Sequence, residues 1–209
     1  MVNSTGVPGV YTPMIVTSEA IVLRSRKQGE TSKIATLYTL SAGKLNVIAK
    51  GARETKSKFG GALEMFARST VVFYKRDKQD ALSLLSKAET IASHSGILKS
   101  LLRIETATAI IELILNSMHD EEANADLFSL LDETLCMIAT SNEESMPTIL
   151  FRFYSQFARI MGFELDIASK SGLSENLQTL LFSLIDSGSD IATISHRDRD
   201  QLASIPDMY

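Results

Sequence analysis

The chain of 209 residues contains one cysteine, four prolines and no tryptophan, and these scarcities exclude several classes of protein. A single cysteine, Cys136, cannot form an internal disulfide, so we expect a reducing compartment, the cytoplasm. Cys136 stands among Leu135, Met137 and Ile138, which predicts a buried, unreactive thiol. No apolar run reaches the ~18 residues that a membrane-spanning helix requires.

The sequence motifs of common enzymes and metal proteins are also missing. There is no GxxxxGK[ST] phosphate loop, no GxGxxG and no GxSxG. The three histidines, His94, His119 and His196, lie far apart without ligand spacing, so no metal and no cofactor is expected. We therefore expect a protein that is not an enzyme. A hydrolase whose site is not recognised from the sequence remains an alternative hypothesis.

Charge is distributed unevenly, although the formal net charge of the whole chain is only −4. Residues 1–78 contain 13 Lys and Arg against 5 Asp and Glu, a net charge of +8. Residues 79–209 contain 8 against 20, a net charge of −12. A local basic field attracts polyanions even when the total charge is negative. This asymmetry predicts that the first part of the chain binds nucleic acid.

Short β-type runs separated by turns occupy residues 17–91. Apolar and β-branched residues alternate from Thr17 until Gln28-Gly29-Glu30 interrupts the pattern. Further strands are expected over residues 34–40, 45–50, 63–75 and 81–91, with a hairpin turn at 41–44 and a basic loop over 51–61. Five short strands predict a small closed barrel of the OB (oligonucleotide-binding) type.

The periodicity becomes helical after about residue 93. Helices are predicted over residues 97–115, 127–139, 148–161 and 177–185, with Pro147 in the first turn of the third and Gly162 at its end. The expected fold class is therefore α+β. Its parts are a flexible tail at residues 1–16, an OB domain at 17–92 and an α-helical bundle domain at 93–209. The tail carries no charge, whereas a signal peptide begins with basic residues, so none is expected.

A groove for single-stranded nucleic acid needs cations for phosphates and flat side chains for bases. The candidate DNA-binding residues are the cations of the β-rich segment and one aromatic residue in its basic loop: Arg24, Arg26, Lys27, Lys33, Lys44, Lys50, Arg53, Lys56, Lys58 and Phe59. Arg24 and Arg26 should share one face of a strand. For any single cation the simpler interpretation is a solvated surface charge, and only the clustering favours a binding patch. Aromatic residues on the strands are expected in the core, which leaves Phe59 as the stacking candidate.

Several short motifs follow one another in this segment: IVLRSR at residues 21–26, GE at 29–30, LYTLSAGKL at 37–45, AKGAR at 49–53 and SKFGGALEMF at 57–66. In their order and spacing they resemble the RecO family of bacterial recombination mediators. In the helical half, RFYSQFARIMGF at residues 152–163 and LQTLLFSLI at 177–185 resemble helices of the same family.

The resemblance implies an OB domain followed by a helical domain, in a non-enzymatic mediator of recombinational DNA repair that works in the cytoplasm at the nucleoid. Members of the family bind single- and double-stranded DNA and anneal complementary strands. They also engage the acidic tail of single-stranded DNA-binding protein and the partner RecR, and they help to load the recombinase RecA. The competing hypothesis is a protein-interaction adaptor that uses the helical domain with little direct DNA contact.

Two departures from the family pattern stand out. Many members carry a four-cysteine zinc site after the helix that ends in GF, whereas residues 162–176, GFELDIASKSGLSEN, contain no cysteine. No structural zinc is therefore expected. Family chains also usually continue through another helix and a basic end, so a shortened form is one interpretation of the end at Tyr209.

Docking of an acidic tail requires a cation beside exposed apolar surface. Arg103, Arg152 and Arg159 lie within apolar helical segments and are the partner-binding candidates, because a guanidinium can bind a carboxylate with two parallel hydrogen bonds. Arg152 is the first choice since it falls in the family-like segment. The alternative for each arginine is an ion pair with an acid of its own domain, such as Glu105 or Glu112.

Overall fold

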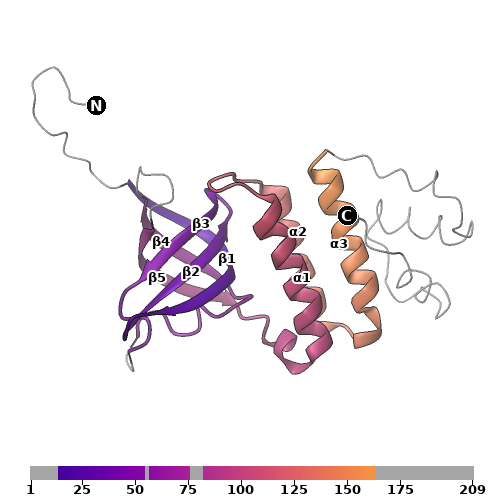
Figure 1. Ribbon diagram of the computed structural model, residues 1–209, viewed down its shortest axis with the longest axis horizontal. Helices are drawn as coiled ribbons and strands as arrows, with labels where there is room; N and C mark the ends of the chain where they lie inside the picture. Colours follow the sequence, from indigo (N-terminus) through magenta and orange to yellow (C-terminus); the bar gives the residue numbers. More distant parts are fainter. Residues whose placement is uncertain (1–13, 55–56, 76–81, 163–209) are drawn as a thin grey trace, which may run out of the picture. The chain divides into compact units, whose positions relative to one another are not determined.

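The computed structural model describes residues 14–54, 57–75 and 82–162. The chain divides into two compact units, one ending at Ser93 and the other beginning at His94. In the described residues, five strands form the first unit, and three α-helices with two short 3-10 helices form the second (Figure 1). The α+β class predicted from the sequence is confirmed. Lys56 and the helix predicted at residues 177–185 lie outside the described residues.

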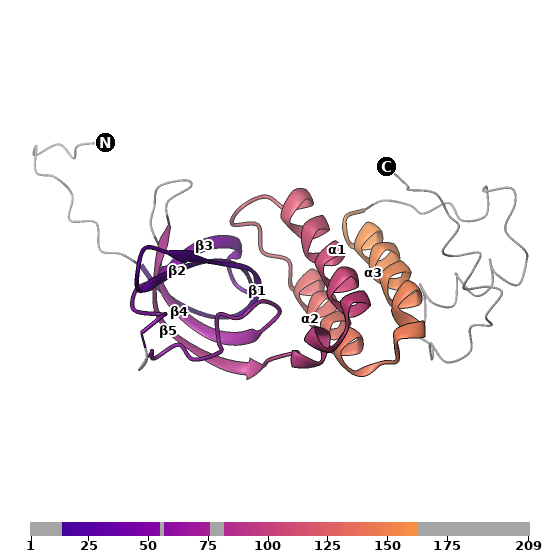
Figure 2. The same ribbon diagram turned by 60° about the horizontal axis from the view of Figure 1, so that its bottom comes forward.

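The strands of the first unit close into a barrel in the order β1-β2-β3-β5-β4 (Figure 2). Their bounds are Met14–Gln28 (β1), Ser32–Thr39 (β2), Gly43–Ala49 (β3), Arg68–Lys75 (β4) and Ser83–Ala92 (β5). All neighbours are antiparallel except β3 and β5, which are parallel and pair only at Val47↔Ser83 and Ile48↔Leu84. β1 is the longest strand, and it pairs with β4 through residues 14–21 and with β2 through residues 20–28.

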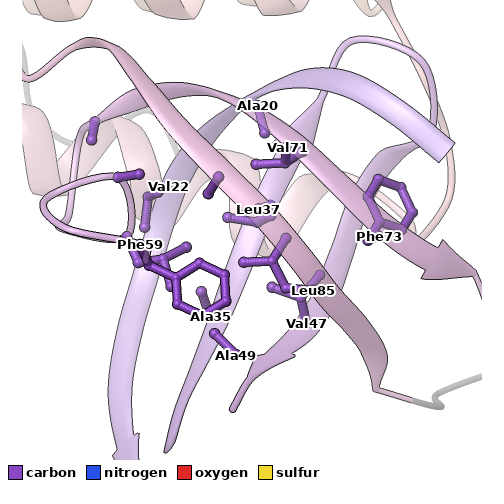
Figure 3. Packing of buried hydrophobic residues seen from close by; sticks show 14 of the residues in the cluster. Ala20, Val22, Ala35, Leu37, Val47, Ala49, Phe59, Val71, Phe73 and Leu85 are labelled. Carbon is purple, nitrogen blue, oxygen red and sulfur yellow. The ribbon is translucent and has the colours of Figure 1, made fainter. Parts of the chain in front are cut away.

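Alternate side chains of the strands fill the barrel, as the period-two pattern predicts (Figure 3). Ala20 and Val22 of β1 point inward with Ala35 and Leu37 of β2, and Leu85 of β5 lies among them. Small residues leave room for Phe59, whose ring enters this core from the segment before β4. The core is therefore closed partly by the strands and partly by a non-strand segment.

Two strand boundaries differ by three residues or more from those predicted, and most others differ by one or two. β1 begins at Met14 rather than Thr17, so residues 14–16 belong to the barrel and not to a flexible tail. β4 begins at Arg68 rather than at residue 63, because residues 57–66 fold as consecutive turns. Ala62 N donates to Phe59 O, and Phe66 has a φ of 71°, which an extended strand does not allow.

The described part of the second unit, which ends at residue 162, contains a 3-10 helix η1 (Ser95–Lys99), α1 (Leu101–Ser117), α2 (Ala125–Thr140), a 3-10 helix η2 (Glu143–Ser145) and α3 (Met146–Ile160). The three α-helices lie side by side in both views (Figures 1 and 2). The first predicted helix is divided because Ser100 is extended, with φ −150° and ψ 143°. Asn124 caps α2 by accepting a hydrogen bond from Leu127 N, and Gly162 follows α3 with a φ of 80°.

The burial of Cys136 was predicted wrongly, because its side chain is exposed. Leu131, Leu135 and Ile138 define the buried face of α2. One step along a helix turns the side chain by about 100°, so Cys136 points away from the face that Leu135 occupies. None of the described helices has the length and hydropathy that a membrane span requires.

Candidate nucleic-acid interface

A β-bulge decides which face of the barrel the first two arginines occupy. Val22 pairs with Leu37 of β2, but Arg24 pairs with the next residue, Thr36, so β1 has one residue more than β2 at this point. If all residues of β1 were paired in strict alternation, with no bulge, Arg24 would point inward with Val22. The bulge turns Arg24 and Arg26 to the outer face, and both side chains are exposed.

On the outer face of β2 and β3, the pair of residues level with Arg24 is polar, whereas the next pair along the strands is Ile34 and Ile48. Thr36 of β2 lies between Arg24 of β1 and Asn46 of β3. The Thr36 hydroxyl donates a hydrogen bond of 2.7 Å to Asn46 Oδ1. Sequence reasoning missed Thr36 and Asn46, although the strand alternation and the register of the β2–β3 hairpin would have placed them opposite each other.

More cations gather at the end of the barrel where β1 turns into β2. We call this group the hairpin-end cluster: Arg26, Lys27, Lys33, Lys50 and Arg53. Lys27 pairs across the strands with Lys33, which pairs with Ala49, the residue before Lys50. Arg53 Nη1 donates to Gly29 O in the β1–β2 turn at 2.9 Å, and Arg53 N donates to Thr31 O at 2.8 Å. The basic loop is thereby attached to the hairpin.

Two of the predicted DNA-binding cations contribute less to this cluster than the sequence indicates. Lys33 Nζ lies 2.8 Å from Glu64 Oε1, so part of the positive charge of the cluster is already neutralised. Lys44 pairs with Tyr38 at the opposite end of the β2–β3 hairpin. Five residues of strand separate Tyr38 from Lys33, about 17 Å. The structure therefore separates Lys44 from the hairpin-end cluster.

Phe59 is not a base-stacking platform, which corrects the prediction. Its side chain is only 3% exposed and belongs to the barrel core (Figure 3). The neighbouring Lys58 is exposed, and its Nζ lies 5.3 Å from the centroid of the Phe59 ring. The loop pattern suggested exposure, but the turns of residues 57–66 direct this aromatic ring inward. In the described residues, the exposed side chains of this region are charged and polar, and the acids Glu30, Glu54 and Glu64 are exposed beside the cations.

Arg103 is engaged within its own unit. Its Nη1 donates to Gly96 O at 3.2 Å and to Ala139 O at 2.9 Å, and its Nη2 donates to Ser141 O at 2.6 Å. Ala139 and Ser141 carry carbonyl groups at the end of α2, which the helix itself leaves without donors. Arg103 therefore joins η1 to the C-terminus of α2, and the prediction that it binds a partner's carboxylate is corrected.

The other two arginines both lie on α3. Arg152 is half-buried, and its Nη1 donates to Met137 Sδ of α2 at 3.1 Å. Its Nε is buried and has no hydrogen-bond partner within the described ranges. Sulfur is a weak acceptor, so this guanidinium keeps most of its capacity to donate. Arg159 is exposed in the last turn of the helix.

Comparison with known proteins shows where the chain has relatives. Residues 14–94 match the family model described as recombination protein O N terminal, and residues 98–203 match recombination protein O C terminal. Proteins named DNA repair protein RecO are similar: that of Salinibacter ruber is 40% identical over 58% of this chain and 46% of its own length. That of Chlorobium limicola is 36% identical over 80% of this chain and 65% of its own length. That of Chloroherpeton thalassium is 34% identical over 73% of this chain and 58% of its own length. The matched part of the chain thus spans about half to two thirds of these curated relatives.

Proposed function

Because this chain belongs to the RecO family of DNA repair proteins, we propose that its barrel binds DNA without sequence preference. The binding surface is the outer face of β1, β2 and β3 together with the hairpin-end cluster. We assign the barrel, whose strands run from Met14 to Ala92, to an OB domain, and the unit that begins at His94 to a helical domain. The protein acts as a recombination mediator that anneals strands, and no enzymatic step is assigned to it.

The arrangement of the strands supports the OB assignment. An OB barrel has five strands, and it binds oligonucleotides on the face of strands 2 and 3 and on the loops that join strands 1 to 2 and 4 to 5. Arg24, Arg26, Thr36 and Asn46 line the first of these surfaces, and the hairpin-end cluster surrounds the first of these loops. The observation that carries the proposal is the bulge, because it turns Arg24 and Arg26 to that face.

The chemistry of this surface favours phosphates over bases. Tyr38, the aromatic residue of β2, is fully buried, and on the described outer face of β1 to β3 no aromatic side chain is exposed. Cations bind phosphates whatever the base, so the affinity should not depend on sequence. Annealing then follows from electrostatics, since the same cations screen the repulsion between two strands.

The test is a salt titration of single-stranded DNA binding by fluorescence anisotropy. Each phosphate contact on a single strand contributes about −0.7 to the slope of log affinity against log salt concentration. If Arg24 and Arg26 each contact a phosphate, Arg24→Gln with Arg26→Gln should make the slope about 1.4 less steep and weaken binding equally for all sequences.

The matched control changes the same number of charges elsewhere. Lys87 of β5 pairs with Glu89 at 2.6 Å, and Lys99 is exposed at the end of η1. The variant Lys87→Gln with Lys99→Gln should keep the slope of the unmodified chain. Equal slopes for the two double variants would refute the proposed face, and a slope near zero for the unmodified chain would refute DNA binding itself.

Arg152 supports a second role, the docking of partner proteins on the helical domain. We propose that its guanidinium binds a carboxylate of the acidic tail of single-stranded DNA-binding protein. The half-buried position lowers the competition from water, and the bond to Met137 Sδ is easily replaced. RecR and the loading of RecA are proposed partners on the family relationship alone, as is a cytoplasmic, nucleoid-associated location.

Calorimetry with an acidic peptide that ends in apolar residues tests this role. Arg152→Glu should lose most of the binding heat while the affinity for DNA stays unchanged. Arg159→Glu, on the same helix but exposed, is the control for a general charge effect. Full peptide binding by a folded Arg152→Glu variant would contradict the assignment. Peptide binding by the unmodified chain, without measurable DNA binding by the unmodified chain or by either variant, would favour the adaptor hypothesis.

A further inference from the structure

The first half of β1 has one edge that no other strand of the described chain covers. Residues 14–21 of β1 pair with β4 on one side, whereas pairing with β2 on the other side begins only at Ala20. The last backbone–backbone hydrogen bond on the β2 side is the one of 2.9 Å from Leu40 N to Glu19 O, and Ser41 N donates to the Ser18 hydroxyl at 3.1 Å. Within the described residues, the edge is therefore open before Ser18.

The hydrogen bonds show which residues present backbone groups to this open edge. Glu19 O accepts from the β2 side, and Val22 N donates toward Ala67 O on the β4 side. In an extended strand the N–H and C=O of one residue point to the same edge, and successive residues alternate. Ile15 and Thr17 therefore point their N–H and C=O groups to the open edge. Within the described residues, none of these four groups has a partner.

The open edge also lacks the features that usually protect an edge strand. No charged residue occurs between Met14 and Ser18. The side chains of Met14 and Ile15 are 63% and 60% exposed. By contrast, β5 beyond its pairing with β3 carries the exposed Lys87 and Glu89. Charges of this kind prevent strand addition, and an uncharged edge with exposed apolar side chains invites it.

We propose that this edge pairs with the same edge of a second copy of the chain. An antiparallel register that sets Ile15 of one copy opposite Thr17 of the other forms four hydrogen bonds and uses the N–H and C=O groups of both residues in each copy. The register is symmetric, so one two-fold axis relates the copies. It brings the two Val16 residues directly opposite each other, and no like charges meet. Glu19 stays outside the new ladder, since Leu40 already occupies its carbonyl.

The short ladder predicts a weak, concentration-dependent association. Four hydrogen bonds and two pairs of exposed apolar side chains cover less than the roughly 1,200 Å² at which stable interfaces begin. The pairing is independent of DNA. Its effect is to join two barrels through β1 into one continuous sheet.

Cysteine cross-linking tests the register. In a Cys136→Ser background, Val16→Cys places two thiols at a non-hydrogen-bonded pair with Cα atoms about 4.5 Å apart, within disulfide range. Thr17→Cys is the matched control, because its two Cα atoms would lie about 8 Å apart, beyond the roughly 7 Å limit. Under mild oxidation, the covalent dimer of the Val16→Cys chain should increase with protein concentration and greatly exceed that of the Thr17→Cys chain.

A proline tests whether the edge hydrogen bonds hold the copies together. Thr17 N–H points to the open edge and not into the β4 ladder, so Thr17→Pro removes an edge donor without removing a ladder bond. Added to the Val16→Cys chain, it should abolish the cross-link while the circular dichroism spectrum stays the same. The proposal is overturned if the Val16→Cys chain stays monomeric at the highest concentration. It is equally overturned if the cross-link survives the proline.

For the unmodified chain, amide exchange at Ile15 and Thr17 should slow as the protein concentration rises, because pairing protects these N–H groups. Exchange rates independent of concentration would contradict the pairing.

Discussion

Replacement of Gly96 by alanine should destabilise the helical unit through a single contact. A Cβ at this position would lie 2.1 Å from Ala139 O and 2.9 Å from Ala139 C, both backbone atoms in the last turn of α2. Backbone cannot rotate away as a side chain can, so η1 must move off α2. The same movement breaks the bridge in which Arg103 Nη1 donates to both Gly96 O and Ala139 O.

The magnitude follows from two costs. An extra methyl group in a well-packed site costs about 1–3 kcal/mol. A hydrogen bond to a charged group contributes about 1.5–3 kcal/mol, and at least one such bond of Arg103 is strained or lost. We therefore expect Gly96→Ala to lower the free energy of unfolding of this unit by about 3 kcal/mol. Alanine at this position would not strain the backbone itself, because Gly96 is not among the glycines with positive φ.

Amide hydrogen exchange in α2 is the suitable assay. The chain has no tryptophan and contains two units, so a single fluorescence transition would not isolate the helical unit. Gly61→Ala is the matched control, because nothing lies within 4 Å of its added Cβ. Unchanged exchange of the α2 amides in Gly96→Ala would refute the contact argument. An undiminished cost of Gly96→Ala in an Arg103→Met background would refute the part assigned to the arginine bridge.

Two further substitutions test the positions of single side chains. Phe59→Ala should destabilise the barrel by about 3–5 kcal/mol because it empties part of the core. Phe59→Leu should cost less and leave DNA affinity unchanged while the barrel is folded, and a specific loss of affinity in Phe59→Leu would restore the ring as a base contact. Asn124→Ala should cost about 1 kcal/mol by removing the cap on Leu127 N–H. Asn124→Asp should retain the stability, and thermal denaturation that ranks the two substitutions equally would contradict the capping role.

Hydrophobic periodicity predicted the strands and helices well because it reports burial, and it failed where burial occurs without regular structure. Residues 63–66 contain Leu63 and Phe66, both buried, so their composition resembles that of a strand. Their backbone instead forms turns, and Phe66 has a positive φ. The beginning of β1 was missed for the opposite reason. Met14 and Ile15 belong to a strand but are exposed, so they do not extend the buried alternation that began at Thr17.

Predictions of site residues were limited by the partners that a sequence does not reveal. Arg103 was expected to meet a carboxylate, from a partner or from Glu105 or Glu112, because acidic side chains are visible in a sequence. Its acceptors are three backbone carbonyls, which every residue carries, and only the packing of η1 against the end of α2 brings these three together. The cations near the β1–β2 turn are close together because they are also close in sequence or paired in hairpins. Lys44 belongs to the β2–β3 hairpin, as Lys33 does, but it lies at the opposite end of that hairpin.

The face of the proposed interface depends on a backbone feature with no side-chain signature. A strict alternation from Ala20 places Arg24 on the inner face, where two arginines could not be solvated. The chain avoids that cost with one unpaired residue between Val22 and Arg24, and every later residue of β1 changes face. The arginines themselves therefore argue for the bulge, since a charged pair after a buried apolar run is incompatible with continued alternation. Where the first part of a barrel strand is apolar and the last part is basic, a change of register is expected at the first charged residue.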